Sequence, residues 1–370
     1  MDMRRVRKGV KAPDFILLLT VTALVGLGVI MVFSSSNYKT HVLYGDAFYY
    51  LKRQVLWAAL GYMAMLAMSR FDYWRLKPLA KPAFLATLAL LILVLIPGIG
   101  RVAHGARRWI GIGNQAFQPS ELSKVVMVVY FSAWLAAAPS RLKHFSRGIL
   151  PYLILVGVVC ALILAEPDLG TAVAIGGSAM LLLFSAGASL GHLLAIGAAA
   201  APALALAIFG EEYRRRRFLA FLNPWADPLG AGFHIIQALY ALGSGGVFGL
   251  GLGQSRQKFF YLPEQHTDFI FAIIGEELGF VGAITVLAAY LLLIWRGYRT
   301  AMAAPDLFGC LLAAGITSVI AVQALINIGV VTGTLPITGI PLPFLSFGGS
   351  SLIFTMAGMG ILLNVSRHTR

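Results

Sequence analysis

The sequence has few cysteines and little charge. Its two cysteines, Cys160 and Cys310, both lie in apolar stretches, which excludes a disulfide framework and a cysteine-based metal site. Charged residues make up 12% of the chain and apolar residues 59%, with a mean hydropathy of +0.81. Soluble domains average about 25% charged and about 45–50% apolar residues. The composition therefore excludes an ordinary soluble protein and indicates an integral membrane protein.

Acidic residues are also scarce, with 15 Asp and Glu against 29 Lys and Arg and a formal net charge of +14. In a soluble protein this excess would suggest a nucleic-acid partner. In a membrane protein the charge asymmetry of the loops is the first explanation. We therefore expect no nucleic acid to bind.

Apolar stretches long enough to cross a bilayer predict an all-α protein with about ten transmembrane helices in one membrane domain over residues 1–370. The first span follows a basic N-terminal tail and is too long for a signal peptide, so we expect it to be retained. The expected spans are residues 14–35, 54–69, 82–98, 120–138, 149–165, 171–187, 190–209, 269–295, 307–332 and 349–364.

The distribution of Lys and Arg predicts the orientation. Sixteen of these residues lie in the two tails and the loops of one side, and six lie in the short loops of the other side. The positive-inside rule then places both termini in the cytoplasm. The long extracytoplasmic connection between the seventh and eighth spans, about 210–268, carries six more basic residues. Loops of this length are usually functional or disordered, and its aromatic residues favour short helices and turns on the membrane surface.

Two charged groups near the outer face are candidates for ligand binding. Glu121 and Lys124 share a helical face, and charges within a bilayer are costly unless they face a cavity. The alternative is a boundary position, with Lys124 reaching water. Arg107 and Arg108 beside Trp109 would suit a phosphate-bearing ligand, or would form an interfacial belt with lipid phosphates.

The long outer connection holds two further candidates. The arginine run at residues 214–217 is either a surface facing lipid headgroups or a pyrophosphate-binding one. Near the next span, Glu264, His266 and Asp268 would point the same way in an extended segment. The alternative is a helix cap, in which the helix N-terminus would depress the pKa of Asp268. Downstream, Pro and Gly within residues 333–351 preclude a helix and indicate an irregular wall packed against protein.

The chain resembles the SEDS family (shape, elongation, division and sporulation) of cell-wall polymerases over nearly its whole length. The matching stretches, in the order of the family, are residues 105–111, 118–122, 166–170, 221–225, 249–264, 266–271 and 339–351. Residues 255–264 and the C-terminal end are more similar to the FtsW/SpoVE branch than to RodA.

The resemblance implies a peptidoglycan glycosyltransferase that polymerises lipid II into β-1,4 glycan strands at the outer face of the cytoplasmic membrane. The site of synthesis would be the division septum or the spore cortex. The implied partners are lipid II, a class B penicillin-binding transpeptidase, and other divisome or sporulation-septum membrane proteins. The alternatives are a lipid II flippase and a non-catalytic scaffold that recruits the transpeptidase.

The resemblance also assigns residues. Asp268 matches the essential aspartate of the family, Trp109 a functionally sensitive position, and Glu121 and Lys124 the polar pair of its central cavity. Inverting transfer needs a base for the acceptor hydroxyl and positive groups for the leaving pyrophosphate. Asp268 would be that base, or a ligand of the Mg²⁺ or Mn²⁺ that the resemblance implies; no organic cofactor is expected. The expected substrate-binding residues are Trp109, Arg107, Arg108, Glu121, Lys124, Glu264, His266, Arg216 and Lys258.

Overall fold

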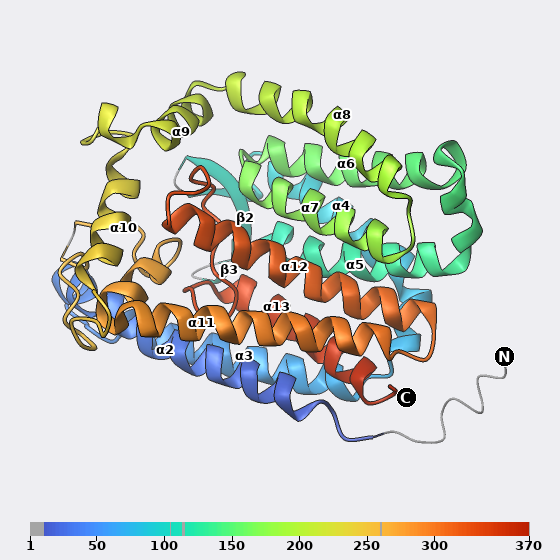
Figure 1. The fold of residues 1–370 in the computed structure, drawn as a ribbon, viewed down its shortest axis with the longest axis horizontal. Helices are drawn as coiled ribbons and strands as arrows, with labels where there is room; N and C mark the ends of the chain where they lie inside the picture. Colours follow the sequence, from blue (N-terminus) through green and yellow to red (C-terminus); the bar gives the residue numbers. More distant parts are fainter. Residues whose placement is uncertain (1–10, 104, 113–114, 260, 370) are drawn as a thin grey trace.

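The computed structural model describes residues 11–103, 105–112, 115–259 and 261–369, so the basic residues expected at positions 4–8 lie outside the described part. Figure 1 shows a bundle of long helices with both ends of the described chain on one side. There the Lys11 amide donates to the Arg367 carbonyl at 2.9 Å, and the Asp14 amide donates to the Ser366 hydroxyl at 3.0 Å. The first and last long helices therefore begin and end together, as an even number of crossings requires.

All ten expected spans are helices. They are α2 (Phe15–Tyr44), α3 (Tyr49–Arg70), α4 (Leu76–Leu95), α5 (Pro119–Ala137), α6 (Leu150–Ala165), α7 (Leu169–Ser185), α8 (Leu190–Phe209), α11 (Ile270–Met302), α12 (Leu307–Val331) and α13 (Gly349–Ser366). Within the described residues, eight helical segments are long and apolar enough to cross a membrane. The other two of the ten are α3, which carries Lys52 and Arg53 near its start, and α7, which has 17 residues.

Acidic N-caps fix where several of these helices begin. The Asp14 carboxylate accepts hydrogen bonds from the amides of Ile16 and Leu17 at the start of α2. Asp306 accepts from the Gly309 amide at 2.8 Å at the start of α12. Such caps satisfy backbone N–H groups that have no partner within the helix.

A small antiparallel sheet lies at the end opposite the ends of the described chain (Figure 1), in place of the expected loops. It consists of β1 (Gly100–Ala103), β2 (Ala106–Ile112) and β3 (Gln115–Phe117) in that order. Short 3₁₀ segments η1 (Tyr73–Arg75), η2 (Pro139–Lys143) and η4 (Pro224–Ala226), and the π-helical turn η3 (Phe145–Ile149), complete the connections. The sheet supplies a rigid support for Arg107, Arg108 and Trp109.

The long connection after α8 folds into short helices and turns, as expected. It contains α9 (Glu212–Leu222) and α10 (Phe233–Ser244), followed by turns up to α11. These turns fill a break in α11 at Gly279, where φ is +68° and glycine is favoured. On one side of the break the Leu250 amide donates to the Glu276 carbonyl at 3.0 Å, and on the other the Phe280 amide donates to the Gly246 carbonyl at 2.9 Å. The connection is thereby joined to α11 by backbone hydrogen bonds.

Two buried glutamates of α11 reinforce this junction. Glu276 accepts from the Arg256 amide at 2.9 Å, and Glu277 accepts from the Ser34 hydroxyl of α2 at 2.6 Å. The Lys258 ammonium lies 3.6 Å from a Glu277 carboxylate oxygen, and both side chains are buried. These charges thus hold the outer connection to the bundle.

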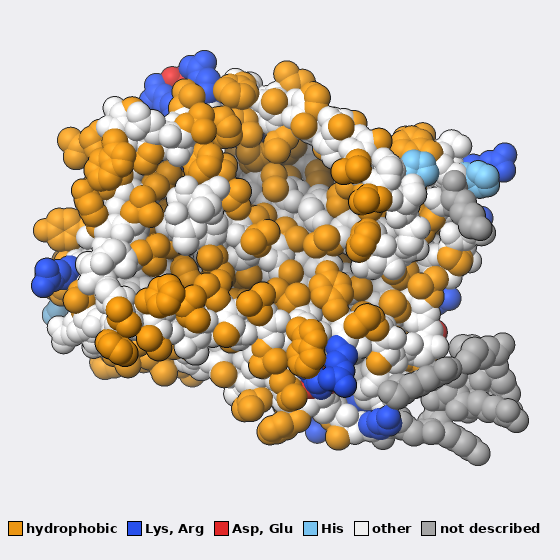
Figure 2. Space-filling view, viewed as in Figure 1, with side chains coloured by type: hydrophobic (Ala, Val, Ile, Leu, Met, Phe, Trp, Pro, Cys, Tyr) orange, Lys and Arg blue, Asp and Glu red, His pale blue; other side chains and the backbone are white. Residues whose placement is uncertain are grey.

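The core and the outer surface differ in packing. Residues 333–348 run without a helix and bury Ile340, Leu342, Phe344 and Leu345 against the bundle, which confirms the irregular wall expected there. In contrast, α8 buries only Leu193. Figure 2 shows apolar side chains over most of the visible face and a hollow beneath the arch that α8 forms in Figure 1.

Candidate active site

The backbone around Asp268 is held by the irregular wall and by α12. The Asn327 amide group donates to the carbonyls of both Asp268 and Ile340, each at 2.8 Å. The Ser346 hydroxyl donates to the Thr267 carbonyl at 2.6 Å. Two segments from later in the sequence, α12 and the wall, therefore hold the backbone at Asp268 just before α11.

The Asp268 side chain is half-buried and lies beside Gly339. Gly339 has φ of +74°, and a Cβ atom placed there would lie 3.5 Å from the Asp268 carboxylate oxygen Oδ2. Among the residues that the structure describes, none donates a hydrogen bond to this carboxylate. The carboxylate therefore has hydrogen-bonding capacity left for a bound molecule.

The electrostatic surroundings of Asp268 raise its pKa. Burial, the largest cause, raises the pKa to about 7, and Glu264 and Asp168 act in the same direction. Arg217 and Arg108 lower it in part. The expectation that the helix N-terminus depresses the pKa of Asp268 is wrong: the N-cap is Phe269, and burial dominates. An aspartate with a pKa near 7 suits general-base chemistry at neutral pH.

The segment before Asp268 is a series of turns, so the expected extended arrangement of Glu264, His266 and Asp268 is wrong. Glu264 has φ of +51°, in the left-handed region, and accepts a hydrogen bond from the Thr267 hydroxyl at 2.8 Å. The His266 ring is buried, with its centroid 4.4 Å from that of Tyr50, and burial lowers its pKa to about 4. Glu264 therefore still acts electrostatically on Asp268. His266 instead packs in the interior and supports the segment.

Arg108 is held by the turn between α6 and α7. Its guanidinium donates to the Glu166 carbonyl at 3.0 Å and to the Pro167 carbonyl, and it lies 3.6 Å from the Asp168 carboxylate. Both carboxylate oxygens of Glu166 are buried without a hydrogen-bond partner among the described residues, and burial raises the pKa of Glu166 to about 8. Arg108 and Asp168 both act on Asp268, so this turn forms one side of the site.

Arg107 and Arg108 diverge because successive residues of a strand point to opposite faces. Arg107 donates to the Leu95 carbonyl at 3.0 Å, at the end of α4. Trp109 is half-buried and is paired with Arg101 of β1. Of the three candidates on β2, Arg108 is the one that acts on Asp268.

Among the four consecutive arginines, the structure brings Arg217 into the site. Arg217 is half-buried, its guanidinium lies 4.2 Å from the ring centroid of Tyr213, and it interacts electrostatically with Asp268 and Arg108. The expected residue, Arg216, pairs with Glu212 on an exposed surface. Arg217 belongs to the candidate run 214–217 expected from the sequence, from which Arg216 alone was singled out; helical spacing places Arg217 on the same face as Ala220, which is buried.

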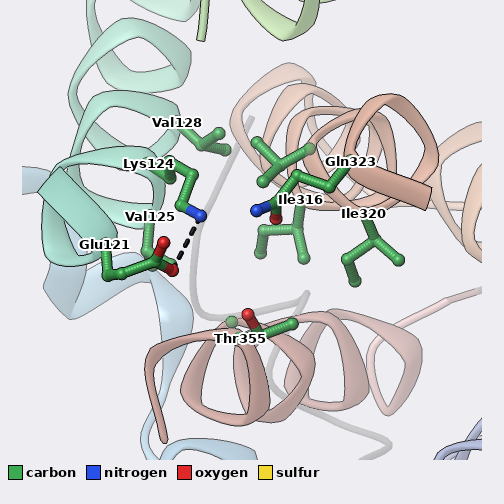
Figure 3. Close-up of a pocket in the computed structure, with 10 residues that line it drawn as sticks. Glu121, Lys124, Val125, Val128, Ile316, Ile320, Gln323 and Thr355 are labelled. Carbon is green, nitrogen blue, oxygen red and sulfur yellow. Dashed lines mark ion pairs between the residues drawn. The ribbon is translucent and has the colours of Figure 1, made fainter. Parts of the chain in front are cut away.

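Glu121 and Lys124 lie inside the bundle rather than at its boundary. Their charged groups are 2.7 Å apart, and both side chains are 4% exposed. They line a cavity of about 20 Å³ that Gln323 and Thr355 close from α12 and α13 (Figure 3). Such a cavity has room for an ordered water molecule.

Lys258 does not lie free in the site. Its ammonium is 3.6 Å from Glu277 and donates to the Gly253 carbonyl. Its own carbonyl accepts a hydrogen bond from the Gln265 side chain at 3.1 Å. Lys258 thus supports the segment that leads to Asp268.

The protein groups around Asp268 offer few metal ligands. In the described part of the chain, no three carboxylate, imidazole or thiol side chains are arranged to hold a metal ion. Mg²⁺ is commonly bound by one or two carboxylates together with substrate phosphates. The residues present therefore fit a divalent cation only if a phosphate-bearing substrate supplies most of its ligands and Asp268 supplies one.

Comparison with known proteins finds matches along the whole chain. The FtsW/RodA/SpoVE family model, described as cell cycle protein, matches residues 15–370. Stage V sporulation protein E of Bacillus subtilis is 46% identical over 359 residues, which cover 97% of this chain and 98% of that protein. The probable peptidoglycan glycosyltransferase FtsW of Geobacter metallireducens is 46% identical over 363 residues, with 98% and 97% covered.

A solved structure shares the fold. It is described as "Structural coordination of polymerization and crosslinking by a peptidoglycan synthase complex", and one of its chains aligns with a TM-score of 0.81 and 34% sequence identity. The alignment covers 96% of this chain and 98% of that chain.

Proposed function

This chain belongs to the FtsW/RodA/SpoVE family, the SEDS proteins, and from that membership we propose that it is a peptidoglycan glycosyltransferase that polymerises lipid II. The observation that carries the proposal is the Asp268 carboxylate, to which no described residue donates a hydrogen bond and whose pKa is raised to about 7. The names of the relatives indicate the glycosyltransferase reaction, and Asp268 is a group suited to act as its base.

The proposed reaction is a single inverting displacement. Asp268 takes the proton from the 4-hydroxyl of the acceptor sugar while that oxygen attacks the anomeric carbon of the donor. The bond to the undecaprenyl pyrophosphate breaks, and the pyrophosphate leaves with the electron pair. No covalent enzyme intermediate is required, so a single carboxylate base suffices.

Arg108 and Arg217 are the residues that we assign to the leaving pyrophosphate. They come from β2 and α9, and both lower the pKa of Asp268, which supports a position of their charges near the base. Guanidinium groups match phosphate oxygens in a bidentate geometry. A divalent cation, where bound, would add charge neutralisation at the pyrophosphate, with Asp268 as its protein ligand.

The structure favours polymerisation over lipid II transport. A flippase requires a polar path wide enough for a disaccharide headgroup. The polar cavity beside Glu121 and Lys124 has a volume of about 20 Å³, and apolar side chains such as Val125, Val128 and Ile320 surround it. This cavity fits water and not a sugar.

The proposed setting is the cytoplasmic membrane of a cell that builds a septum or a spore cortex. Eight apolar helices and family membership support a multi-pass membrane protein. Cytoplasmic termini would place Asp268 at the outer face, because Asp268 directly precedes α11, which begins at the end of the bundle opposite the ends of the described chain (Figure 1). The similar chain of a peptidoglycan synthase complex supports a class B transpeptidase as partner.

The test is reconstitution of the purified protein, with and without the transpeptidase, in vesicles that contain lipid II. We expect glycan chains resolved by gel electrophoresis, and no translocation of fluorescent lipid II in vesicles that hold this protein alone. Translocation without polymer would overturn the proposal in favour of a flippase. Absence of both, in protein that supports transpeptidase recruitment, would favour a scaffold.

A further inference from the structure

His234 of α10 lies in the same cluster as Asp268 but has no role in the reaction as proposed. Its ring centroid is 5.8 Å from that of Phe269, the residue next to Asp268. It also interacts electrostatically with Arg217 and Glu264, the two charged groups with the largest effect on Asp268. Three segments, α9, α10 and the turn before α11, therefore place these side chains around one site.

The imidazole of His234 is available to a ligand. The ring is half-buried, and among the described residues no side chain or carbonyl forms a hydrogen bond with either ring nitrogen. His192, by contrast, has its Nδ1 atom 2.8 Å from the Ser189 hydroxyl. A half-buried imidazole without a protein partner, packed near Phe269 in the same cluster as Asp268, is a candidate for contact with substrate.

The charge state of His234 restricts the type of contact. Burial and the nearby Arg217 lower its pKa from 6.5, against a smaller opposing effect of Glu264. The ring also lies in the first turn of α10, where the positive end of the helix dipole disfavours an imidazolium. At neutral pH the ring is therefore uncharged, with one nitrogen donating and the other accepting a hydrogen bond.

An uncharged donor and acceptor suits sugar hydroxyl and N-acetyl groups rather than pyrophosphate. The nearby charged groups suit the other parts of the substrate. Arg217 and Arg108 suit the pyrophosphate, and Asp268 suits the acceptor hydroxyl. We infer that His234 is a further substrate-binding residue, which contacts the saccharide part of lipid II from α10. This inference rests on the proposed function.

The experiment measures polymerisation by the full-length protein in vesicles, with lipid II as the probe. We expect His234→Ala to raise KM for lipid II about tenfold, the effect of one lost hydrogen bond, with kcat within about twofold of wild type. His234→Gln, whose amide also donates and accepts, should restore KM to within about threefold of wild type. His192→Ala, the same change at the far end of α8, serves as the control and should leave KM unchanged.

Several results would overturn the inference while the proposed function stands. One is an active His234→Ala protein with the KM of wild type. Another is a His234→Gln protein as impaired as His234→Ala, with a lower thermal unfolding temperature in both, because that pattern would show a packing role. Failure of the wild-type protein to form polymer would instead overturn the proposed function itself.

Discussion

Asp268 lies between charges that shift its pKa in opposite directions. Burial and Glu264 raise the pKa, whereas Arg217 and Arg108 lower it, and the result is a value of about 7. A base with such a pKa is about half ionised at neutral pH, so its activity responds to each neighbouring charge. The roles of these neighbours can therefore be measured separately.

The first prediction concerns pH. The rate of polymerisation should rise with pH through a midpoint near 7, because Asp268 accepts a proton only when it is ionised. Removing the charge of Glu264 by Glu264→Gln should move the midpoint to lower pH, since Glu264 raises the pKa of Asp268. Initial rates from pH 5 to pH 9 measure this. Glu211→Gln, an exposed glutamate at the start of α9, is the control, and an unshifted midpoint in Glu264→Gln would contradict the electrostatic assignment.

The second prediction separates two adjacent arginines. Arg217→Gln should lower kcat/KM by about 100-fold, because a donor aimed at developing charge is lost. Arg216→Gln should change it by less than about twofold, because exposed ion pairs such as that with Glu212 contribute little. Steady-state rates with lipid II distinguish the two residues. Equal losses in both variants would indicate a general effect of the basic surface instead.

Sequence reasoning found the carboxylate but not all of its neighbours. Asp268 and Arg108 lie in segments that resemble family motifs, so both could be proposed from the sequence. Arg217 could not be separated from Arg216 without the phase of α9, which depends on how that helix packs. The arrangement of Glu264 and His266 depends on the left-handed backbone conformation of Glu264. The sequence has no glycine at that position to indicate the turn.

At the scale of elements, the outer connection is joined to α11 through buried charges. Lys258 and Glu277 form an ion pair with both side chains buried, next to the break at Gly279. A buried ion that loses its partner is strongly destabilising. This junction therefore determines whether the segment before Asp268 keeps its shape.

The third prediction tests that junction. Lys258→Met should lower the stability of the protein by about 3–5 kcal/mol, because it leaves the Glu277 carboxylate buried without its cation. The double variant Lys258→Met with Glu277→Leu should recover part of the loss. Thermal unfolding in detergent measures both. Lys52→Met, which breaks an exposed pair with Asp46, should leave the unfolding temperature unchanged, and an equal fall in Lys52→Met and Lys258→Met would contradict the assignment.

The helices were predictable because each corresponds to a long stretch of apolar residues. Each expected span contains enough consecutive apolar residues to identify a helix, and all ten are helices in the structure. The sheet was not predictable, since its strands have between three and seven residues and β2 contains two arginines and a glycine. The break in α11 depends on hydrogen bonds from a distant segment, which hydropathy does not report.

At the scale of the whole molecule, the basic residues at the end of the bundle opposite the termini serve different purposes. The net charge is +14, yet several of the candidates have internal partners: Lys258 pairs with Glu277, and Arg107 donates to the Leu95 carbonyl. Arg108 and Arg217 are the two whose charges act on Asp268. Of the many basic residues, Arg108 and Arg217 are thus the candidates for binding a ligand at Asp268.

We propose that this chain polymerises lipid II with Asp268 as its base. The most direct test measures glycan-chain formation from lipid II in vesicles by wild type, Asp268→Ala and the control Glu211→Ala, with folding of each variant checked by thermal unfolding. We predict glycan chains from wild type and Glu211→Ala and none from folded Asp268→Ala. Polymerisation by Asp268→Ala at the wild-type rate would contradict the account.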